Sequence, residues 1–210
     1  MRSVQIIMFC FCGLSSCIAK KENTYEENFA LCTKNRAAIS EDTNAELKSE
    51  LKSYECMKGS KSPVFMIKTD HGDSIITKPS HGKAMVLYFW YIAKSNPPFG
   101  QTDIEDMEAL NSLYHSFSEH VDFIGFPFNE FFTAKRYACK HQLDFPQAQG
   151  EATAEKEFKI TQGNNPFIIF INTKGQIVKI FAGSYARKNK IIEKYTPIIQ
   201  ACINNNAYIE

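Results

Sequence analysis

Apolar and polar residues alternate along the chain in blocks that predict strands and helices in turn. The uninterrupted apolar run Ala84–Trp90 predicts a central strand that is covered on both faces. Further on, apolar residues from Ile104 to Phe117 recur at the spacing of an amphipathic helix. A last helix is predicted over 187–204, although Pro197 should kink it. Its inward stripe consists of Ile191, Tyr195, Ile198, Ile199 and Cys202.

Shorter periodic segments complete the pattern. Strands are predicted over 64–69, 74–77, 121–126, 166–172 and 176–181, and a helix over 129–140. Gly and Ser residues at 59–63 predict a linker or a turn, and the turn at 71–74 predicts a hairpin at the start of the main domain. The order of hairpin, strand, helix, strand, helix, hairpin and helix predicts an α/β fold. We expect a central mixed sheet with helices on both faces.

The N-terminus has the features of an export signal. A short basic start is followed by the apolar run Val4–Leu14, which has the length of a signal peptide. The following Leu14-Ser15-Ser16-Cys17 resembles a bacterial lipobox, in which Cys17 becomes the lipidated first residue; the alternative is a plain secretory signal with a chance cysteine. We therefore expect a lipoprotein signal peptide at 1–16, a tether and helical extension at 17–60, and the main domain at 61–210.

The composition argues against nucleic acid and metal ions as ligands. Lys and Arg number 24 against 23 Asp and Glu, so the chain offers no electrostatic footprint for nucleic acid. The histidines are scattered and no Cys/His cluster has the spacing of a zinc site, so we expect no metal and no cofactor. The hydrophobic content of 44% is sufficient for a substantial core.

Three segments, in this order, resemble the thioredoxin-like superfamily, and in particular its TlpA/ResA and AhpC/TSA (redoxin) branch of bacterial envelope proteins. The first is the hairpin region from Gly59 to Thr77. The second is the strand that ends in Phe89-Trp90, with the Pro-containing loop and helix behind it. The third, Gly163-Asn164-Asn165-Pro166, is similar to the family's Gly-x-x-Pro segment. The resemblance implies a thioredoxin-like fold for 61–210 and a cis bond between Asn165 and Pro166, beside the loop that follows Trp90.

The chain departs from this family at the residues that carry the chemistry. The family places Cys-x-x-Cys, or a peroxidatic cysteine, in the loop after the Trp, where a helix N-terminus lowers the thiol pKa. No cysteine occurs between Tyr91 and Asp103. Thioredoxins also bury an acid just before the Phe-Trp pair, and Tyr88 occupies that position here. The resemblance therefore indicates a relative that has lost its redox cysteines.

Two functions remain open at this point, so the sequence does not decide whether the chain is an enzyme. The first is a binding or structural module, anchored to a membrane through Cys17, on the periplasmic side of the bacterial envelope or at the cell surface. Its partner would be a peptide or an envelope protein, because the family's cis-proline exposes a backbone edge. The predicted groove consists of Trp90, Ser95, Asn96, Pro97, Asn165 and Pro166. The alternative is a thiol-disulfide oxidoreductase with displaced cysteines.

The cysteines that remain after the signal are Cys32, Cys56, Cys139 and Cys202, which allow three full pairings. Cys32 and Cys56 both lie in the extension, whereas the thioredoxin fold puts the helices of Cys139 and Cys202 on opposite sides of the sheet. We therefore expect Cys32 and Cys56 to pair. Cys139 has basic neighbours on its helix, and Cys202 belongs to an apolar stripe.

Overall fold

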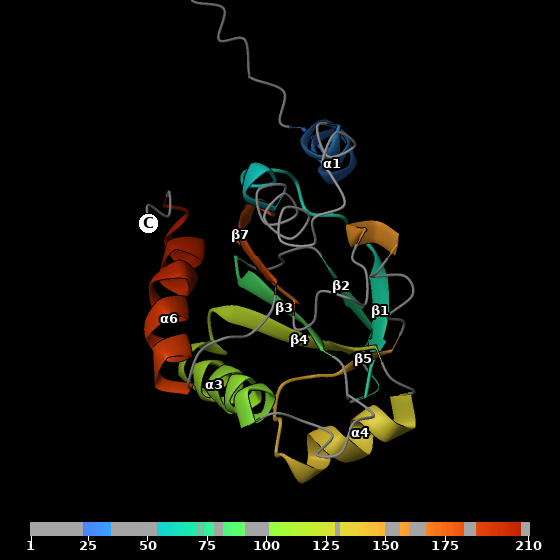
Figure 1. Cartoon of the computed structure of the whole chain (residues 1–210), viewed down its shortest axis with the longest axis vertical. Helices are drawn as coiled ribbons and strands as arrows, with labels where there is room; N and C mark the ends of the chain where they lie inside the picture. Colours follow the sequence, from blue (N-terminus) through green and yellow to red (C-terminus); the bar gives the residue numbers. More distant parts are fainter. Residues whose placement is uncertain are drawn as a thin grey trace, which may run out of the picture.

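The computed structural model describes residues 23–34, 54–70, 72, 74–77, 82–90, 101–128, 131–149, 156–159, 167–182 and 188–206. Its helices and strands are α1 (Tyr25–Thr33), β1 (Met66–Thr69), β2 (Ser74–Ile76), β3 (Ala84–Trp90), α3 (Gln101–Phe117), β4 (Val121–Pro127), α4 (Phe131–Lys140), β5 (Ala148–Gln149), β6 (Phe167–Ile171), β7 (Ile177–Ala182) and α6 (Lys188–Asn204). Figure 1 shows their arrangement.

The strands form two adjoining sheets. The larger has the order β4-β3-β6-β7, in which β3 runs parallel to β4 and antiparallel to β6. The smaller has the order β2-β1-β5 and contains the predicted N-terminal hairpin. An isolated parallel bridge between Gly125 and Gln147 joins the two sheets. The central sheet is therefore mixed, as the sequence predicts.

Strand β3 is buried along its whole length, and its side chains alternate between two separate cores. Val86, Tyr88 and Trp90 point into one core, whereas Leu87 and Phe89 point into the other. A strand that carries apolar residues on both faces requires a covering layer on each side. The rest of the fold supplies these two layers.

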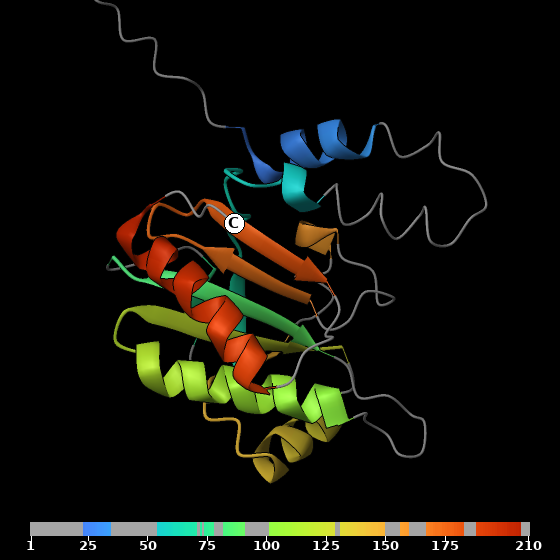
Figure 2. The same cartoon turned by 60° about the vertical axis from the view of Figure 1, so that its left-hand side comes forward.

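Helices α3, α4 and α6 supply the first layer. Helices α4 and α6, which carry Cys139 and Cys202, thus contribute to the same core, and the expectation that they lie on opposite sides of the sheet is wrong. Figure 2 shows α3 and α6 in front of the strands of the larger sheet. The inward stripe of α6 is buried as predicted, and the helix continues through Pro197. On α3, Met107 and Leu110 are buried, and Leu113 joins them. These helices thus cover the face to which Trp90 belongs.

The N-terminal extension helps to supply the second layer, which is rich in aromatic residues. Tyr25, Tyr54 and Met57 are buried in the same core as Phe89. The ring of Tyr54 meets that of Phe167 edge to face, with centroids 4.9 Å apart. The extension and the sheet therefore share one core, because neither could bury these rings alone.

Helix α1 is held to this layer at both ends. At its start, the Thr24 hydroxyl and the Glu27 carboxylate form a capping box with each other's backbone N–H. The Tyr25 hydroxyl donates a hydrogen bond to the carbonyl of Phe158, at 2.8 Å. Near its end, Cys32 and Cys56 form the expected disulfide, with a Cα–Cα distance of 5.8 Å. The helix is thus part of the folded domain.

The structure adds local features that the sequence did not predict. Residues 59–63, predicted as a linker or a turn, begin at the end of a turn over 57–59 and then lie along the start of β7. There Gly59 N–H donates to Ile177 and Ser62 N–H donates to Gly175. Glycine and serine are typical of linkers, and their composition does not reveal this pairing. The short strand β5 and the helical turn at 156–158 were not predicted, because neither is long enough to show a period. Residues 35–53 of the predicted helical extension lie outside the described residues.

The disulfide should stabilise the domain measurably. Its partners are 24 residues apart, and cross-linking a loop of that length removes chain entropy equivalent to about 3 kcal/mol from the unfolded state. We expect the double variant Cys32→Ser/Cys56→Ser to lose about this much free energy of unfolding in urea titrations. Cys139→Ser is the matched control, because Cys139 is a free, exposed thiol. An unchanged midpoint for the double variant would contradict the structural role of the bridge.

Candidate functional site

The C-terminal end of β3 is the candidate site, and Trp90 is its best-defined residue. The indole is only 1% exposed. Its N–H donates to the side-chain oxygen of Gln147, at 3.1 Å. Trp90 is thus a core residue with a satisfied polar group in this structure. The other residues of the predicted groove, Ser95, Asn96, Pro97, Asn165 and Pro166, lie outside the described residues, so both the groove and the cis bond remain predictions.

Gln147 fixes the end of β3 to the hairpin sheet. Its side-chain amide donates to the carbonyl of Phe145, and its backbone N–H donates to the Asp70 carboxylate, each at 2.9 Å. Asp70 N–H in turn donates to the Gln147 carbonyl, at 2.8 Å. Sequence reasoning missed Gln147, because no local pattern connects it with a tryptophan 57 positions earlier.

Gly125 makes room for this amide. A Cβ atom at position 125 would overlap the side chain of Gln147. Gly125 N–H donates to the carbonyl of Pro146, at 2.9 Å, so the backbone of β4 approaches that of the Gln147 segment closely. Only glycine allows this approach together with the Trp90–Gln147 hydrogen bond.

An aromatic row leads from Trp90 to α4. The centroids of Trp90 and Tyr137 are 6.0 Å apart, and those of Tyr137 and His141 are 4.2 Å apart. Partial burial, and then the charge of Lys140, lower the pKa of His141. The imidazole is therefore biased toward its neutral form and favours stacking over ion pairing.

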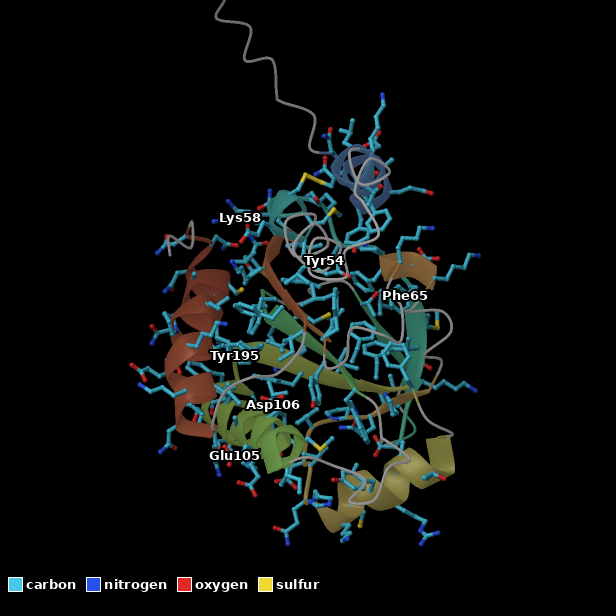
Figure 3. All side chains as sticks on the ribbon, viewed as in Figure 1. Tyr54, Lys58, Phe65, Glu105, Asp106 and Tyr195 are labelled. Atoms are coloured by element: carbon cyan, nitrogen blue, oxygen red, sulfur yellow. A yellow bond between two sulfur atoms is a disulfide. The ribbon has the colours of Figure 1, made fainter. Side chains whose placement is uncertain are left out.

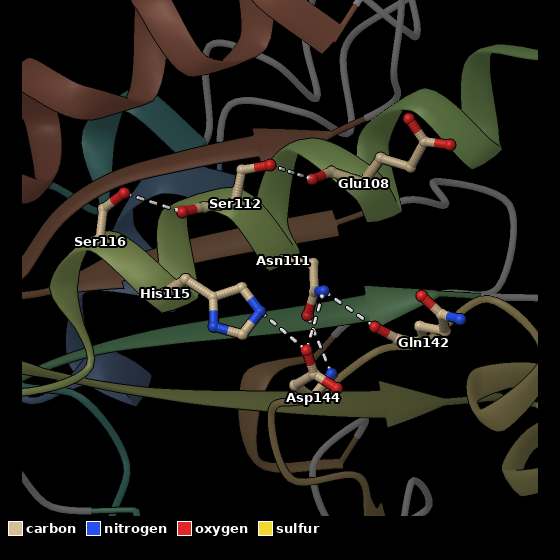
Figure 4. Close-up of polar contacts among 7 residues, drawn as sticks. All are labelled: Glu108, Asn111, Ser112, His115, Ser116, Gln142 and Asp144. Atoms are coloured by element: carbon tan, nitrogen blue, oxygen red, sulfur yellow. Dashed lines mark hydrogen bonds and ion pairs between the residues drawn. The ribbon is translucent and has the colours of Figure 1, made fainter.

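A polar cluster holds α3 to the segment that follows α4 (Figure 4). The Asn111 amide donates to the carbonyl of Gln142, at 2.8 Å, and accepts from Asp144 N–H at the same distance. His115 Nε2 lies 2.7 Å from the Asp144 carboxylate. Both of these side chains are more than half exposed, so solvent screens the pair and it contributes little to stability. The cluster positions the chain between α4 and Gln147.

We compared the sequence and the fold of this chain with those of known proteins. Neither the family models nor the curated proteins yield a match. Among solved structures, the thioredoxin domain of a Bacteroides vulgatus thiol-disulfide oxidoreductase matches with a TM-score of 0.53 and 16% identity, over 68% of this chain and 97% of that one. A thioredoxin family thiol:disulfide interchange protein from Chlorobium tepidum matches with a TM-score of 0.51 and 18% identity, over 68% and 95%. A secreted Mycobacterium tuberculosis disulfide oxidoreductase matches with a TM-score of 0.51 and 15% identity, over 65% and 95%.

The chain has a thioredoxin-like fold. The match confirms the fold that the sequence predicts, including the mixed central sheet.

None of the described cysteines lies on β3 or at the start of α3. Burial raises the pKa of Cys202 to about 12, so its thiol stays protonated and unreactive at neutral pH. Cys139 is free and exposed on α4. Cys32 and Cys56 are consumed by their disulfide.

The first half of α3 contributes a buried carboxyl group. Asp106 of α3 is 2% exposed, and Tyr195 of α6 is also buried (Figure 3). Burial raises the pKa of Tyr195, and the charge of Asp106 raises it further. Next to them, Glu105 accepts a hydrogen bond from the first backbone N–H of α6, at 3.0 Å. The sequence analysis considered a buried acid only on the strand, at the position before Phe89-Trp90. It therefore missed Asp106, which lies on helix α3.

Within the described parts of the chain, no group of His, Cys, Asp and Glu side chains is arranged to hold a metal ion. No helix among those residues combines the length and the apolar character needed to cross a bilayer.

Gly125→Ala should disturb Trp90 through Gln147. The new methyl group displaces the amide and leaves the buried indole N–H without its acceptor, which costs about 1–3 kcal/mol. We expect that loss in the free energy of unfolding, together with a shifted emission maximum of Trp90, the sole tryptophan.

Gln147→Ala is the comparison, because it removes the same acceptor without introducing a clash. In the double variant Gly125→Ala/Gln147→Ala, the second change should add clearly less than its separate cost. Strict additivity of the two losses would show that Gly125 does not act through Gln147.

Proposed function

We propose that this chain is a lipid-anchored, thioredoxin-like protein of the bacterial cell envelope that binds a peptide or an envelope protein and does not exchange thiols. The observation that carries the proposal is the combination of a thioredoxin-like fold with a segment between β3 and α3 that contains no cysteine. Thiol-disulfide exchange requires an attacking thiolate and, in thioredoxins, a second thiol that resolves the mixed disulfide.

The placement of the remaining cysteines supports this proposal. The thiol of Cys202 is buried in the core, and the only described cysteine pair links α1 to the helical turn at Tyr54. At the end of β3, by contrast, Trp90 and Gln147 are held by several hydrogen bonds. A rigid strand end next to the predicted groove suits a binding site, because preorganised groups lose little entropy when a ligand binds.

The envelope location is proposed from the lipobox and from the structural relatives. One of these relatives is described as a secreted disulfide oxidoreductase. The disulfide Cys32–Cys56 fits an oxidising compartment. The anchor itself rests on Cys17.

One observation favours the alternative function, thiol-disulfide exchange through displaced cysteines. Cys56 is exposed, so the sulfur of the Cys32–Cys56 bridge on that side is within reach of an external thiol. A reductant could attack there and leave Cys32 as the free thiolate.

An insulin reduction assay with dithiothreitol separates the two functions. We expect turnover at the background rate of dithiothreitol alone, both for the wild-type protein and for Cys32→Ser/Cys56→Ser. Cys139→Ser controls for the free thiol. Turnover well above background that the double variant abolishes would establish the exchange function and refute the binding proposal.

The anchor has its own test. Replacing Cys17 by Ala should release the protein from the membrane fraction or leave the precursor uncut, because the acyl chains hold it at about 0.8 kcal/mol per buried methylene. Cys12→Ala is the matched control, since Cys12 lies within the predicted signal peptide. Membrane fractionation and the intact mass of the mature chain are the readouts. Unchanged processing and fractionation of Cys17→Ala would refute lipidation.

A further inference from the structure

The outer face of the hairpin sheet carries apolar residues where polar ones are the rule. Strand β1 pairs antiparallel with β2, and its Ile67 is buried in the aromatic core. Side chains alternate along an extended chain, so Val64, Met66 and Lys68 lie on the face opposite to Ile67, and all three are exposed. An antiparallel sheet with one solvated face normally has polar residues on that face. Two of these three outward residues are apolar instead.

Three exposed apolar side chains adjoin one another on this face. Met66 is directly opposite Ile76 in the register of β1 and β2, so their side chains are neighbours. The pairing extends one residue further, because Thr77 N–H donates to the carbonyl of Phe65 at 2.9 Å. Val64 therefore lies next to Met66 on the same face. We call Val64, Met66 and Ile76 the hairpin patch.

The hairpin patch is open to its surroundings. Its three residues are 58%, 68% and 53% exposed in chain order, and among the described residues only one other large apolar residue, Leu31, is exposed. Figure 1 shows the hairpin on the side of the larger sheet opposite to α6. Exposed apolar side chains that gather in one place mark an interaction surface, whereas isolated ones need no explanation.

The rest of this outer face carries a base and no acid. Lys68 and Ser74 are opposite each other in the same register and complete the outward positions 64, 66, 68, 74 and 76. Apolar side chains beside a lysine suit the interfacial region of a bilayer. There the stem of the lysine lies along apolar groups, while its ammonium group stays among the lipid phosphates.

The predicted anchor lies close to this patch along the chain. Asn23 is the first described residue, and its carbonyl accepts a hydrogen bond from Lys61 N–H, at 3.1 Å, three residues before Val64. Val64 also borders the same hollow, of about 330 Å³, as Thr24. Only residues 18–22 separate Cys17 from Asn23, and a chain of that length spans about 22 Å at most. A lipidated Cys17 therefore keeps this side of the domain near the bilayer.

We propose that the hairpin patch rests on the bilayer that holds the lipid anchor. Met66 and Ile76 then lie among the headgroups and the upper acyl chains, and Lys68 reaches the lipid phosphates. The inference rests on the proposed function, because it requires lipid on Cys17, and it adds the orientation of the domain. Helix α6, on the opposite side of the larger sheet, faces away from the membrane.

Lipid-attached quenchers test this orientation in vesicles that contain the acylated full chain. A fluorophore is attached at Met66→Cys or, as the matched control, at Gln200→Cys on α6, where Gln200 is also exposed. Both variants carry Cys139→Ser, which removes the exposed free thiol. Nitroxide groups near the top of the acyl chains should quench the label at position 66 at least threefold more strongly than the label at position 200. Equal quenching overturns the proposal.

Aqueous iodide separates the bilayer from a protein partner. In the vesicles, the label at position 66 should be shielded from iodide and quenched by the lipid nitroxide. A label that is shielded from iodide but not quenched by the nitroxide is covered by a second copy of the chain or by another protein. That result overturns the proposal.

A new charge tests the contact itself. Met66→Glu should reduce the nitroxide quenching of a label at Val64→Cys at least threefold, because it places a carboxylate in the hairpin patch. Gln200→Glu is the matched control, since it adds the same charge on α6 and should leave that quenching unchanged. Equal effects of the two substitutions overturn the proposal.

The intact mass of the same chains distinguishes this inference from the proposed anchor. A mature chain without acyl groups refutes the anchor and this inference together. An acylated chain with equal quenching at positions 66 and 200 overturns this inference alone.

Discussion

Burial of β3 on both faces is the constraint on which the rest of this structure depends. A strand whose side chains alternate between two apolar cores cannot lie at a surface, so the chain must supply two covering layers. Helices α3, α4 and α6 cover one face. On the other face, the extension provides Tyr25, Tyr54 and Met57. The N-terminal region thus contributes to the second layer that the central strand requires.

The same strand determines where polar chemistry can occur. Trp90 ends β3 inside the core, so its N–H needs a buried acceptor, which Gln147 provides. Gln147 fits only because Gly125 lacks a side chain. Hydrogen bonds with Asp70 then tie this arrangement to the hairpin sheet. The need to satisfy one buried donor in the middle of the fold thereby specifies contacts among three segments that are far apart in the sequence.

Patterns of period two and of period 3.6 were sufficient to predict most helices and strands. The burial of Ile191 and Cys202 on α6 and the uniform burial of β3 are confirmed, because each pattern extends over several turns or positions. The pairing of 59–63 with β7 could not be predicted, since it consists of backbone hydrogen bonds that any residue type can make.

The site was less predictable than the fold. Gln147 and Asp106 act through partners that are distant in the sequence. Such pairings are set by tertiary packing and leave no local period.

The disulfide has a topological consequence. It converts residues 32–56 into a covalently closed ring, in which Cys32 packs against the aromatic core and Cys56 lies between Tyr54 and Met57 of that core. A peptide bond cut anywhere between the two cysteines leaves both pieces joined through sulfur, with α1 still attached to its neighbours. Doubling the length of the ring would cost only about 0.6 kcal/mol of closure free energy. Apart from Tyr54, which is itself buried in that layer, the length of the chain between the cysteines is thereby largely uncoupled from the integrity of the layer that protects β3.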